Sequence, residues 1–337
     1  MDGYIALLGK LLNFKSLIFY SLFICTYSNI PVIHPITCFL KRSDYIEQNS
    51  LKDSFGKDES WLILSKIEQS IKKKVEDKGV PLKNWNIQIY RGILTGYNKA
   101  FIINEKQKNK LIEEDPKSAE IIRPILRGRD IKRYEYTFSG LWLINVHNGI
   151  KAQNLPPINI EDYPAIKDYL DNYYPQLAKR ADKGDTPYNL RNCVYMNDFL
   201  QPKIVWGNLC LSAQFTIAEG DYYINAPSTF IAPGNKYILA VLNSKLGDWY
   251  IRQLGVTRNG GYFEYTPMVV QQLPVPQIPE EKQKPFKSMV DIVLKNKREQ
   301  LNTLELEQRI DQMIYNLYSL SNEERIFLEK ESKINLE

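Results

Sequence analysis

The sequence has few of the residues from which metal and nucleophilic sites are usually built. Its 337 residues include four cysteines and two histidines, and the cysteines form no Cys-x-x-Cys pair. Zinc sites need such pairs at short spacing, so we expect no zinc centre. His34 and His147 are far apart in sequence, which argues against a histidine-based acid–base or metal site. We expect reduced, largely buried thiols, as in a cytoplasmic protein. The cysteines are Cys25, Cys38, Cys193 and Cys210.

Motifs for nucleotide hydrolysis and for metal-dependent DNA cleavage are also absent. The chain contains no Gly-x-x-x-x-Gly-Lys-Ser/Thr loop that could cradle phosphates. Three Glu-x-Lys pairs occur, but none is preceded by the Pro-Asp pair that magnesium nucleases use. Pairs this short arise by chance in a chain with 25% charged residues. We therefore expect neither an NTPase motor nor a magnesium nuclease.

The first 55 residues differ from the remainder in composition. Residues 16–40 contain no Asp, Glu, Lys or Arg, and they are long enough to span a bilayer. Asn29, Pro31 and Pro35 interrupt the stretch, however, and no small-x-small signal-peptidase site follows it. Three interpretations stay open: a remnant of a larger protein or a misassigned start, which is favoured, then a buried core segment, and a membrane anchor.

Beyond Trp61, hydrophobic periodicity predicts an α+β domain with a mixed β-sheet. Amphipathic spacing predicts a helix over residues 63–75, ended by Gly79, Val80 and Pro81. Alternation over residues 85–90 predicts a half-buried strand. Further expected elements are a tight turn framed by Gly92 and Gly96, a returning strand at 100–103, a charged helical segment at 104–122 with a new start at Asp115-Pro116, strands at 141–146, 203–206 and 213–217, and a helix at 237–252.

The C-terminal part of the chain is predicted to be helical. Pro274, Pro276 and Pro279 indicate a stiff connector, because proline can continue neither a central strand nor a helix. Beyond it, apolar residues recur at near-heptad intervals, which indicates one long helical arm that packs on a neighbour or folds back on its own domain. We thus expect an N-terminal segment at 1–55, a main domain at 56–279 and the arm at 280–337.

Positive charge is concentrated in one region of the main domain. The net charge is +5, but residues 60–135 carry 17 Lys and Arg against 10 Asp and Glu, whereas residues 280–337 carry 10 against 12. Within this region, residues 123–134 hold five basic side chains and one acid. Such a patch suits a polyanion, because Lys and Arg contact phosphates and Arg also grips guanine with two hydrogen bonds. A solvated basic loop would have the same composition.

The order of several short motifs resembles a known family. Gly92-Ile-Leu-Thr-Gly-Tyr-Asn98 is followed after about twenty residues by Ile121-Ile-Arg-Pro-Ile-Leu-Arg-Gly-Arg-Asp-Ile131. Together they resemble the TaqI-like C-terminal specificity domain of adenine-specific DNA methyltransferases and type IIG restriction enzymes. The resemblance covers about residues 60–320. It continues through Trp142-Leu-Ile, Pro202-Lys-Ile-Val, Asn243-Ser-Lys-Leu and Leu273-Pro-Val-Pro.

The resemblance implies recognition without catalysis. In the family a catalytic domain precedes the specificity domain and binds S-adenosylmethionine, and an Asn/Asp-Pro-Pro-aromatic tetrapeptide holds the target base. Neither this tetrapeptide nor a Gly-rich donor turn occurs here. We therefore expect a cytoplasmic protein that binds double-stranded DNA, holds no cofactor itself, and acts with a separate methyltransferase or endonuclease domain or subunit.

Candidate DNA-binding residues come from the basic segment and from three loops. Asp130 is expected to pin neighbouring Arg or backbone groups, because phosphates repel a carboxylate. The phosphate candidates are Arg127, Arg129, Lys132 and Arg133. The loop candidates for base contacts are Tyr97, Asn98, Trp206, Asn208, Arg258, Asn259 and Tyr262.

Two alternatives to a recognition module remain. The chain could be a fragment of an S-adenosylmethionine-dependent adenine methyltransferase or type IIG restriction enzyme, which an upstream reading frame with the missing tetrapeptide would reveal. It could also be a membrane-associated interaction protein anchored through residues 17–40. A membrane is not among the partners that we expect.

Overall fold

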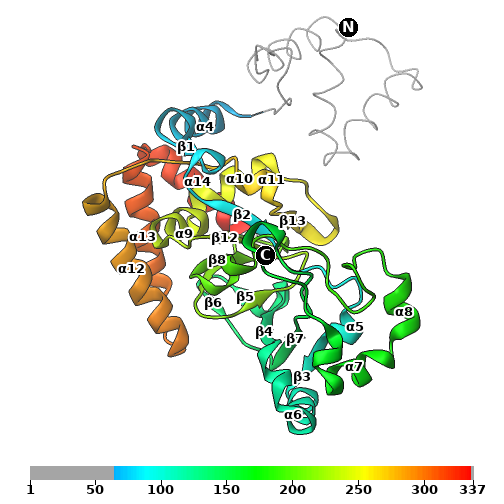
Figure 1. Cartoon of the computed structure of the whole chain (residues 1–337). Coiled ribbons are helices and arrows are strands. Elements are labelled where there is room, and N and C mark those ends of the chain that lie inside the picture. Colours follow the sequence, from blue (N-terminus) through cyan, green and yellow to red (C-terminus); the bar gives the residue numbers. More distant parts are fainter. Residues whose placement is uncertain (1–63, 335–337) are drawn as a thin grey trace, which may run out of the picture. The chain divides into compact units, whose positions relative to one another are not determined.

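A four-stranded antiparallel sheet lies at the centre of the part of the chain that the structure describes. This computed structural model describes residues 64–334, so the expectations for residues 1–55 lie outside the described residues. The strand order is β10-β8-β12-β2, with every neighbouring pair antiparallel (Figure 1). The strands are β2 (Gln88–Arg91), β8 (Lys203–Trp206), β10 (Phe215–Ala218) and β12 (Thr229–Ala232).

The two faces of this central sheet contact two different hydrophobic cores. Successive side chains of a strand point to opposite faces. On β8, Ile204 and Trp206 therefore join one core, and Val205 joins the other. On β12, Ile231 and Phe230 divide in the same way. Burial on both faces explains why Ile204, Val205 and Trp206 of β8 are all apolar rather than alternating with polar residues.

A second sheet and a group of short helices form the core on one side. Its strand order is β11-β4-β7-β3, and it is mixed, because β11 runs parallel to β4 whereas the other pairs are antiparallel. The strands are β3 (Ile102–Asn104), β4 (Ile122–Leu126), β7 (Leu141–Ile144) and β11 (Tyr223–Ile224). The helices are α5 (Asn98–Phe101), α6 (Glu105–Glu114), α7 (Pro164–Asp171) and α8 (Tyr174–Lys179). These sheets and helices confirm the α+β class.

A second group of helices covers the other face of the central sheet (Figure 1). They are α4 (Lys66–Lys78), α9 (Lys236–Asn243), α10 (Lys245–Leu254), α12 (Glu280–Arg298), α13 (Leu304–Leu317) and α14 (Asn322–Ile334). The expected helix over 237–252 is thus two helices. The break falls at Ser244, whose hydroxyl accepts the Gly247 N–H at 3.0 Å and so caps α10.

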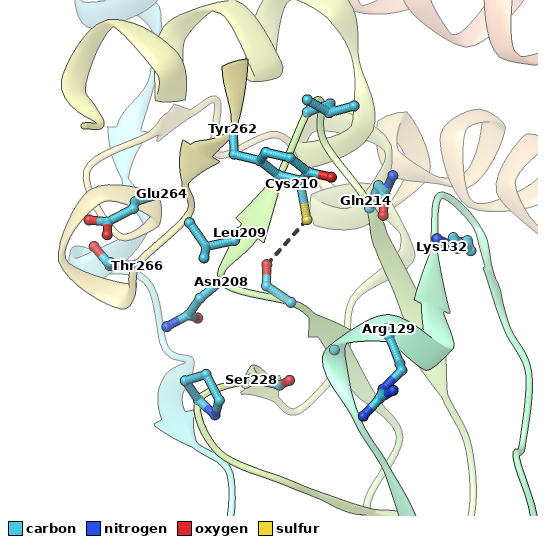
Figure 2. A pocket seen from close by; sticks show the side chains of 14 residues that line it. Arg129, Lys132, Asn208, Leu209, Cys210, Gln214, Ser228, Tyr262, Glu264 and Thr266 are labelled. Carbon is cyan, nitrogen blue, oxygen red and sulfur yellow. Dashed lines mark hydrogen bonds between the residues drawn. The ribbon is translucent and has the colours of Figure 1, made fainter. Parts of the chain in front are cut away.

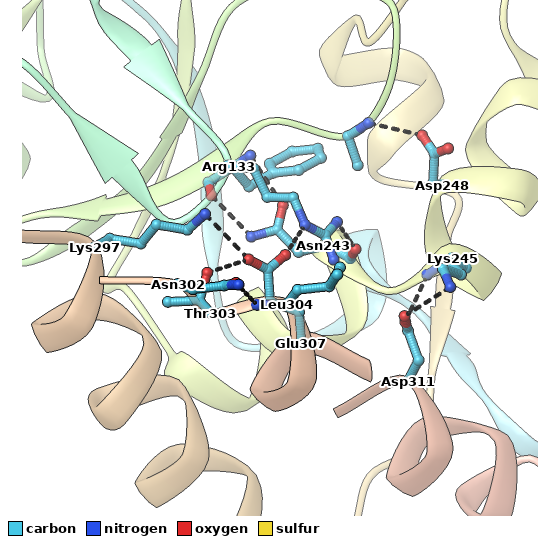
Figure 3. A network of polar contacts seen from close by, with 12 residues as sticks. Arg133, Asn243, Lys245, Asp248, Lys297, Asn302, Thr303, Leu304, Glu307 and Asp311 are labelled. Atoms are coloured by element: carbon cyan, nitrogen blue, oxygen red, sulfur yellow. Dashed lines mark hydrogen bonds and ion pairs between the residues drawn. The ribbon is translucent and has the colours of Figure 1, made fainter. Parts of the chain in front are cut away.

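The C-terminal segment consists of three helices rather than one long one. Of the two alternatives for it, folding back on its own domain is what the structure shows, since α12 and α13 bury apolar residues in the core with α9 and α10. An ion-pair network also joins α13 to the rest (Figure 3). Glu307 binds Arg133 and lies 3.2 Å from Lys297, and Asp311 accepts the Lys245 N–H at 2.9 Å.

The expected returning strand at 100–103 is partly wrong. Residues 98–101 form α5, and the strand that follows, β3, pairs with β7 in the second sheet and not with β2. Ala100 and Phe101 are fully buried, and a short apolar run fits a buried helix as well as a strand. By contrast, the helix end at Gly79 and the new start capped by Asp115 are confirmed.

Three two-stranded ribbons complete the described part of the chain. The expected connector at 273–279 contains one short strand, β14, which proline permits at a sheet edge. Among residues 64–334, no helix is long and apolar enough to cross a membrane. The ribbons are β1 (Val80–Pro81) with β14 (Pro274–Val275), β5 (Ile131–Lys132) with β6 (Glu135–Tyr136), and β9 (Leu209–Cys210) with β13 (Phe263–Glu264). A short helix, α11 (Pro267–Val270), follows β13.

Candidate nucleic-acid interface

The basic segment forms a tight turn that Asp130 holds together. Asp130 is 7% exposed and accepts hydrogen bonds from the backbone N–H of Arg127 at 2.8 Å and from its side chain at 2.9 and 3.0 Å. The expectation that this carboxylate pins a neighbouring arginine and backbone is confirmed. Charge-assisted bonds of this kind fix the turn at residues 128–130, and they commit the Arg127 guanidinium to the fold.

Two other basic side chains of the segment, Arg123 and Arg133, are also bound within the protein. Arg123 donates to the backbone oxygens of Ala119, Ile122 and Glu120. Arg133 binds Glu307 of α13 and the Asn243 carbonyl (Figure 3).

Arg129 and Lys132 are both exposed, and neither has a hydrogen-bond or ion-pair partner among residues 64–334. Of the five basic side chains in residues 123–134, these two are the ones that the fold leaves available to an anion.

Arg129 and Lys132 line a cavity of about 610 Å³. In Figure 2 they form one wall, while Leu209, Tyr262 and Glu264 of the β9–β13 ribbon lie on the other side. Polar side chains contribute the remaining hydrogen-bonding groups. These are Asn208, Gln214, Ser228 and Thr266.

Two glycines allow the two walls to approach each other. A Cβ atom at Gly207 would lie 3.3 Å from the Cα of Gly128, so any side chain there would press on the turn that carries Arg129.

Immediately after Gly207, Asn208 is fixed by two hydrogen bonds. Its side-chain oxygen accepts the Thr229 hydroxyl at 2.9 Å, and its carbonyl accepts the Tyr265 N–H at 2.8 Å. The Asn208 amide nitrogen makes no hydrogen bond within the described residues and borders the cavity.

The loop at residues 256–262 contributes one further predicted residue to the cavity. Tyr262 is 43% exposed and lines it. Arg258 lies 2.6 Å from Glu264, so this guanidinium neutralises the carboxylate nearest to the cavity. Asn259 is exposed in the turn and does not line the cavity.

The remaining loop candidates lie elsewhere. Trp206 is 1% exposed, and its indole N–H donates to the Tyr265 carbonyl at 2.7 Å, so the ring supports the cavity from the core and cannot reach a ligand. Tyr97 and Asn98 belong to the turn at the start of α5. There, Tyr97 packs against Tyr173 with ring centroids 6.1 Å apart. Gln214, Ser228 and Thr266 were not anticipated, because nothing in their local sequence distinguishes them.

The thiol that lines the cavity is not available as a nucleophile at neutral pH. Burial raises the pKa of the Cys210 thiol to about 12, so it stays protonated at neutral pH. Cys193 is likewise free, and burial raises its pKa to about 11. Within residues 64–334, no three His, Cys, Asp or Glu side chains are grouped so that they could hold a metal ion. What the site offers is hydrogen-bond donors and positive charge.

Comparison with known proteins identifies the fold that carries this cavity. Residues 123–275 match the family model of the TaqI-like C-terminal specificity domain. The resemblance in the sequence is therefore confirmed, and the matched range includes the basic turn and both walls of the cavity.

Three similar proteins support the match. The chain is 22% identical over 242 residues to the type II methyltransferase M.MjaIV of Methanocaldococcus jannaschii, covering 66% of this chain and 76% of that protein. It is 20% identical over 273 residues to the type II methyltransferase M.PaeR7I of Pseudomonas aeruginosa, covering 79% of this chain and 44% of that protein. The solved type IIL restriction-modification enzyme MmeI, in complex with DNA, has a similar fold with a TM-score of 0.58, at 13% identity, over 77% of this chain and 37% of that one.

The chain spans less than half the length of M.PaeR7I and of MmeI.

Proposed function

We propose that this chain is the sequence-specific, double-stranded DNA recognition module of an adenine-specific methyltransferase or restriction-modification system. The observation that carries the proposal is the pair of exposed, unpartnered cations beside a cavity with uncommitted polar groups. The match to a specificity domain and the type II methyltransferase relatives support it.

The groups around the cavity suit both kinds of contact that DNA recognition needs. Lys132 and Arg129 can neutralise phosphates, which supplies affinity but no sequence information. Arginine can also bind guanine O6 and N7 in a bidentate manner, and the amides of Asn208 and Gln214 can bind adenine N6 and N7. The pairing of Glu264 with Arg258 reduces the repulsion that a lone carboxylate would exert on the backbone.

We further propose that methyl transfer or cleavage is carried out by a separate catalytic domain or subunit, which would also bind S-adenosylmethionine. We expect this chain itself to hold no cofactor, because the Gly-rich donor turn and the Asn/Asp-Pro-Pro-aromatic tetrapeptide do not occur in the sequence. A cytoplasmic location fits a partner that is DNA and the free thiols of Cys193 and Cys210.

The proposal is tested by selecting duplexes that the purified chain binds from a randomised pool, at low and at physiological salt. We expect a consensus sequence, and no methyl transfer to it when S-adenosylmethionine is added to the chain alone. Gln214→Ala should relax the consensus at a single position, by about 1–3 kcal/mol. Arg129→Ala should instead weaken binding to all sequences alike, because a phosphate contact carries no sequence information. Lys106→Ala, which removes an exposed unpaired cation far from the cavity lining, should leave it unchanged. Absence of DNA binding even at low salt would refute the proposal.

A further inference from the structure

One face of the ribbon beside the cavity is apolar and exposed. The ribbon consists of residues 209–211, 262–264 and 256–258. The first two segments contain β9 and β13, and the third pairs with β13 on its other side. Its exposed aliphatic and aromatic side chains are Leu209 at 55%, Leu211 at 40%, Val256 at 52% and Tyr262 at 43%.

The pairing of the strands shows that these side chains share a face. Glu264 pairs with Leu209, and Phe263 pairs with Cys210 on one side and with Thr257 on the other. Residues directly opposite each other in antiparallel strands point to the same face, and their neighbours point to the other. Cys210 and Phe263 therefore turn inward, where Cys210 is buried.

The alternate positions turn outward. They are Leu209, Leu211, Val256, Arg258, Tyr262 and Glu264, and we call them the apolar ribbon face.

Scattered exposed apolar residues need no explanation, but three aliphatic residues and a tyrosine on one face of one ribbon indicate a contact surface. Two features indicate what covers it. Leu209, Leu211 and Tyr262 line the same cavity as Arg129 and Lys132, so whatever contacts the leucines also meets two unpartnered cations. The charge of Glu264 is balanced by Arg258 at 2.6 Å. The occupant should thus present negative charge on one side and apolar groups on the other.

We propose that the apolar ribbon face enters the major groove of DNA and contacts the 5-methyl groups of thymines, while Arg129 and Lys132 hold the adjacent backbone. The major groove admits a two-stranded ribbon, and the thymine methyl is the apolar group that the base pairs expose there. This inference rests on the proposed function and adds to it a class of base: at least one position of the target is thymine, recognised through its methyl group by Leu209, Leu211 or both.

The experiment removes that methyl group alone. Duplexes carrying the selected consensus are made with deoxyuridine in place of each thymine in turn, which keeps the base pair and deletes one methyl group. Burial of one methyl group corresponds to about a fourfold change in Kd. We expect the wild-type chain to bind about fourfold more weakly when the contacted thymine is replaced.

Leucine variants then assign the contact to the ribbon. Leu209→Ala and Leu211→Ala change exposed side chains, so the fold should tolerate them, and at least one should bind thymine and uracil duplexes equally. Leu301→Ala is the matched control, because Leu301 is 53% exposed and lies outside the ribbon; this variant should keep the fourfold difference.

Three results would overturn the inference, and they can be told apart. A consensus without thymine, or equal binding of all uracil-substituted duplexes by the wild-type chain, would show that no methyl group is recognised. Retention of the full thymine preference by both leucine variants would place the methyl contact elsewhere and leave the ribbon face to a protein partner. In all three cases the chain still binds DNA, whereas loss of binding by the wild-type chain to every duplex refutes the proposed function itself.

Discussion

Replacing Asp311 should change how stability depends on pH. Asp311 lies on α13, and its side chain is 2% exposed. Burial raises its pKa from the ordinary 3.8 to about 6, although Arg133 and Lys245 favour the ionised form. The free-energy cost of removing the ionised carboxylate from water is therefore larger than the stabilisation that these two cations provide.

The sign of the effect follows from the direction of the pKa shift. Because the folded pKa is above the unfolded one, the folded protein holds the proton more tightly between about pH 4 and pH 6. The contribution of Asp311 to the free energy of unfolding thus declines as pH rises through this window. A shift of about two pKa units corresponds to about 3 kcal/mol.

Asp311→Asn cannot ionise and so lacks this decline. Urea unfolding of both proteins from pH 4 to pH 7.5 measures the difference in their free energies of unfolding, in which titration of all other groups cancels. As pH rises over this range, the variant should become more stable relative to wild type by about 3 kcal/mol. Asp291→Asn, at a half-exposed carboxylate of α12 that pairs with Lys236, is the control at an exposed position. A pH-independent difference for Asp311→Asn, or one that moves in favour of wild type, would refute the reasoning.

Two further predictions concern the turns around the cavity. Asp130→Ala should lower the free energy of unfolding by about 2–3 kcal/mol, since it removes three hydrogen bonds to a partly exposed Arg127; a loss below about 0.5 kcal/mol in urea unfolding would contradict this account. Gly92→Ala should cost about 2–3 kcal/mol, because its Cβ would lie 2.4 Å from the carbonyl oxygen of Ile224 and backbone must shift; an unchanged thermal midpoint would show that the two segments separate freely.

Elements that depend on local chemistry could be predicted from the sequence. The helix α4 begins with a capping box formed by Ser65 and Glu68, and it follows the expected apolar spacing. The break at Ser244 could not be predicted, because Leu242 and Leu246 continue the same apolar spacing across it. The partner of β3 is decided by contacts between segments about forty residues apart, which leave no mark in the short apolar run itself.

At the candidate site, too, features that depend on neighbouring residues could be predicted from the sequence, whereas contacts with distant segments could not. The sequence indicates a basic turn, but it does not distinguish Arg129 from Arg133. The difference arises from Glu307, 174 positions away in the chain, which binds one of them and not the other. The cavity likewise combines polar residues from separate segments. Patterns within a single sequence do not reveal that Gln214 and Thr266 line the same cavity.

The central claim is that Arg129 and Lys132 contact the backbone of double-stranded DNA, and a salt titration tests it most directly. The logarithm of the binding constant falls linearly with the logarithm of salt concentration, by about 0.9 for each phosphate neutralised. The double variant Arg129→Ala/Lys132→Ala should therefore reduce the slope by about 1.8 relative to wild type.

The matched control is Lys106→Ala/Lys284→Ala, which removes the same charge from two exposed positions outside the cavity lining. Our account predicts a reduced slope for the first double variant and an unchanged slope for the control. Equal slopes for the wild type and both double variants would contradict it.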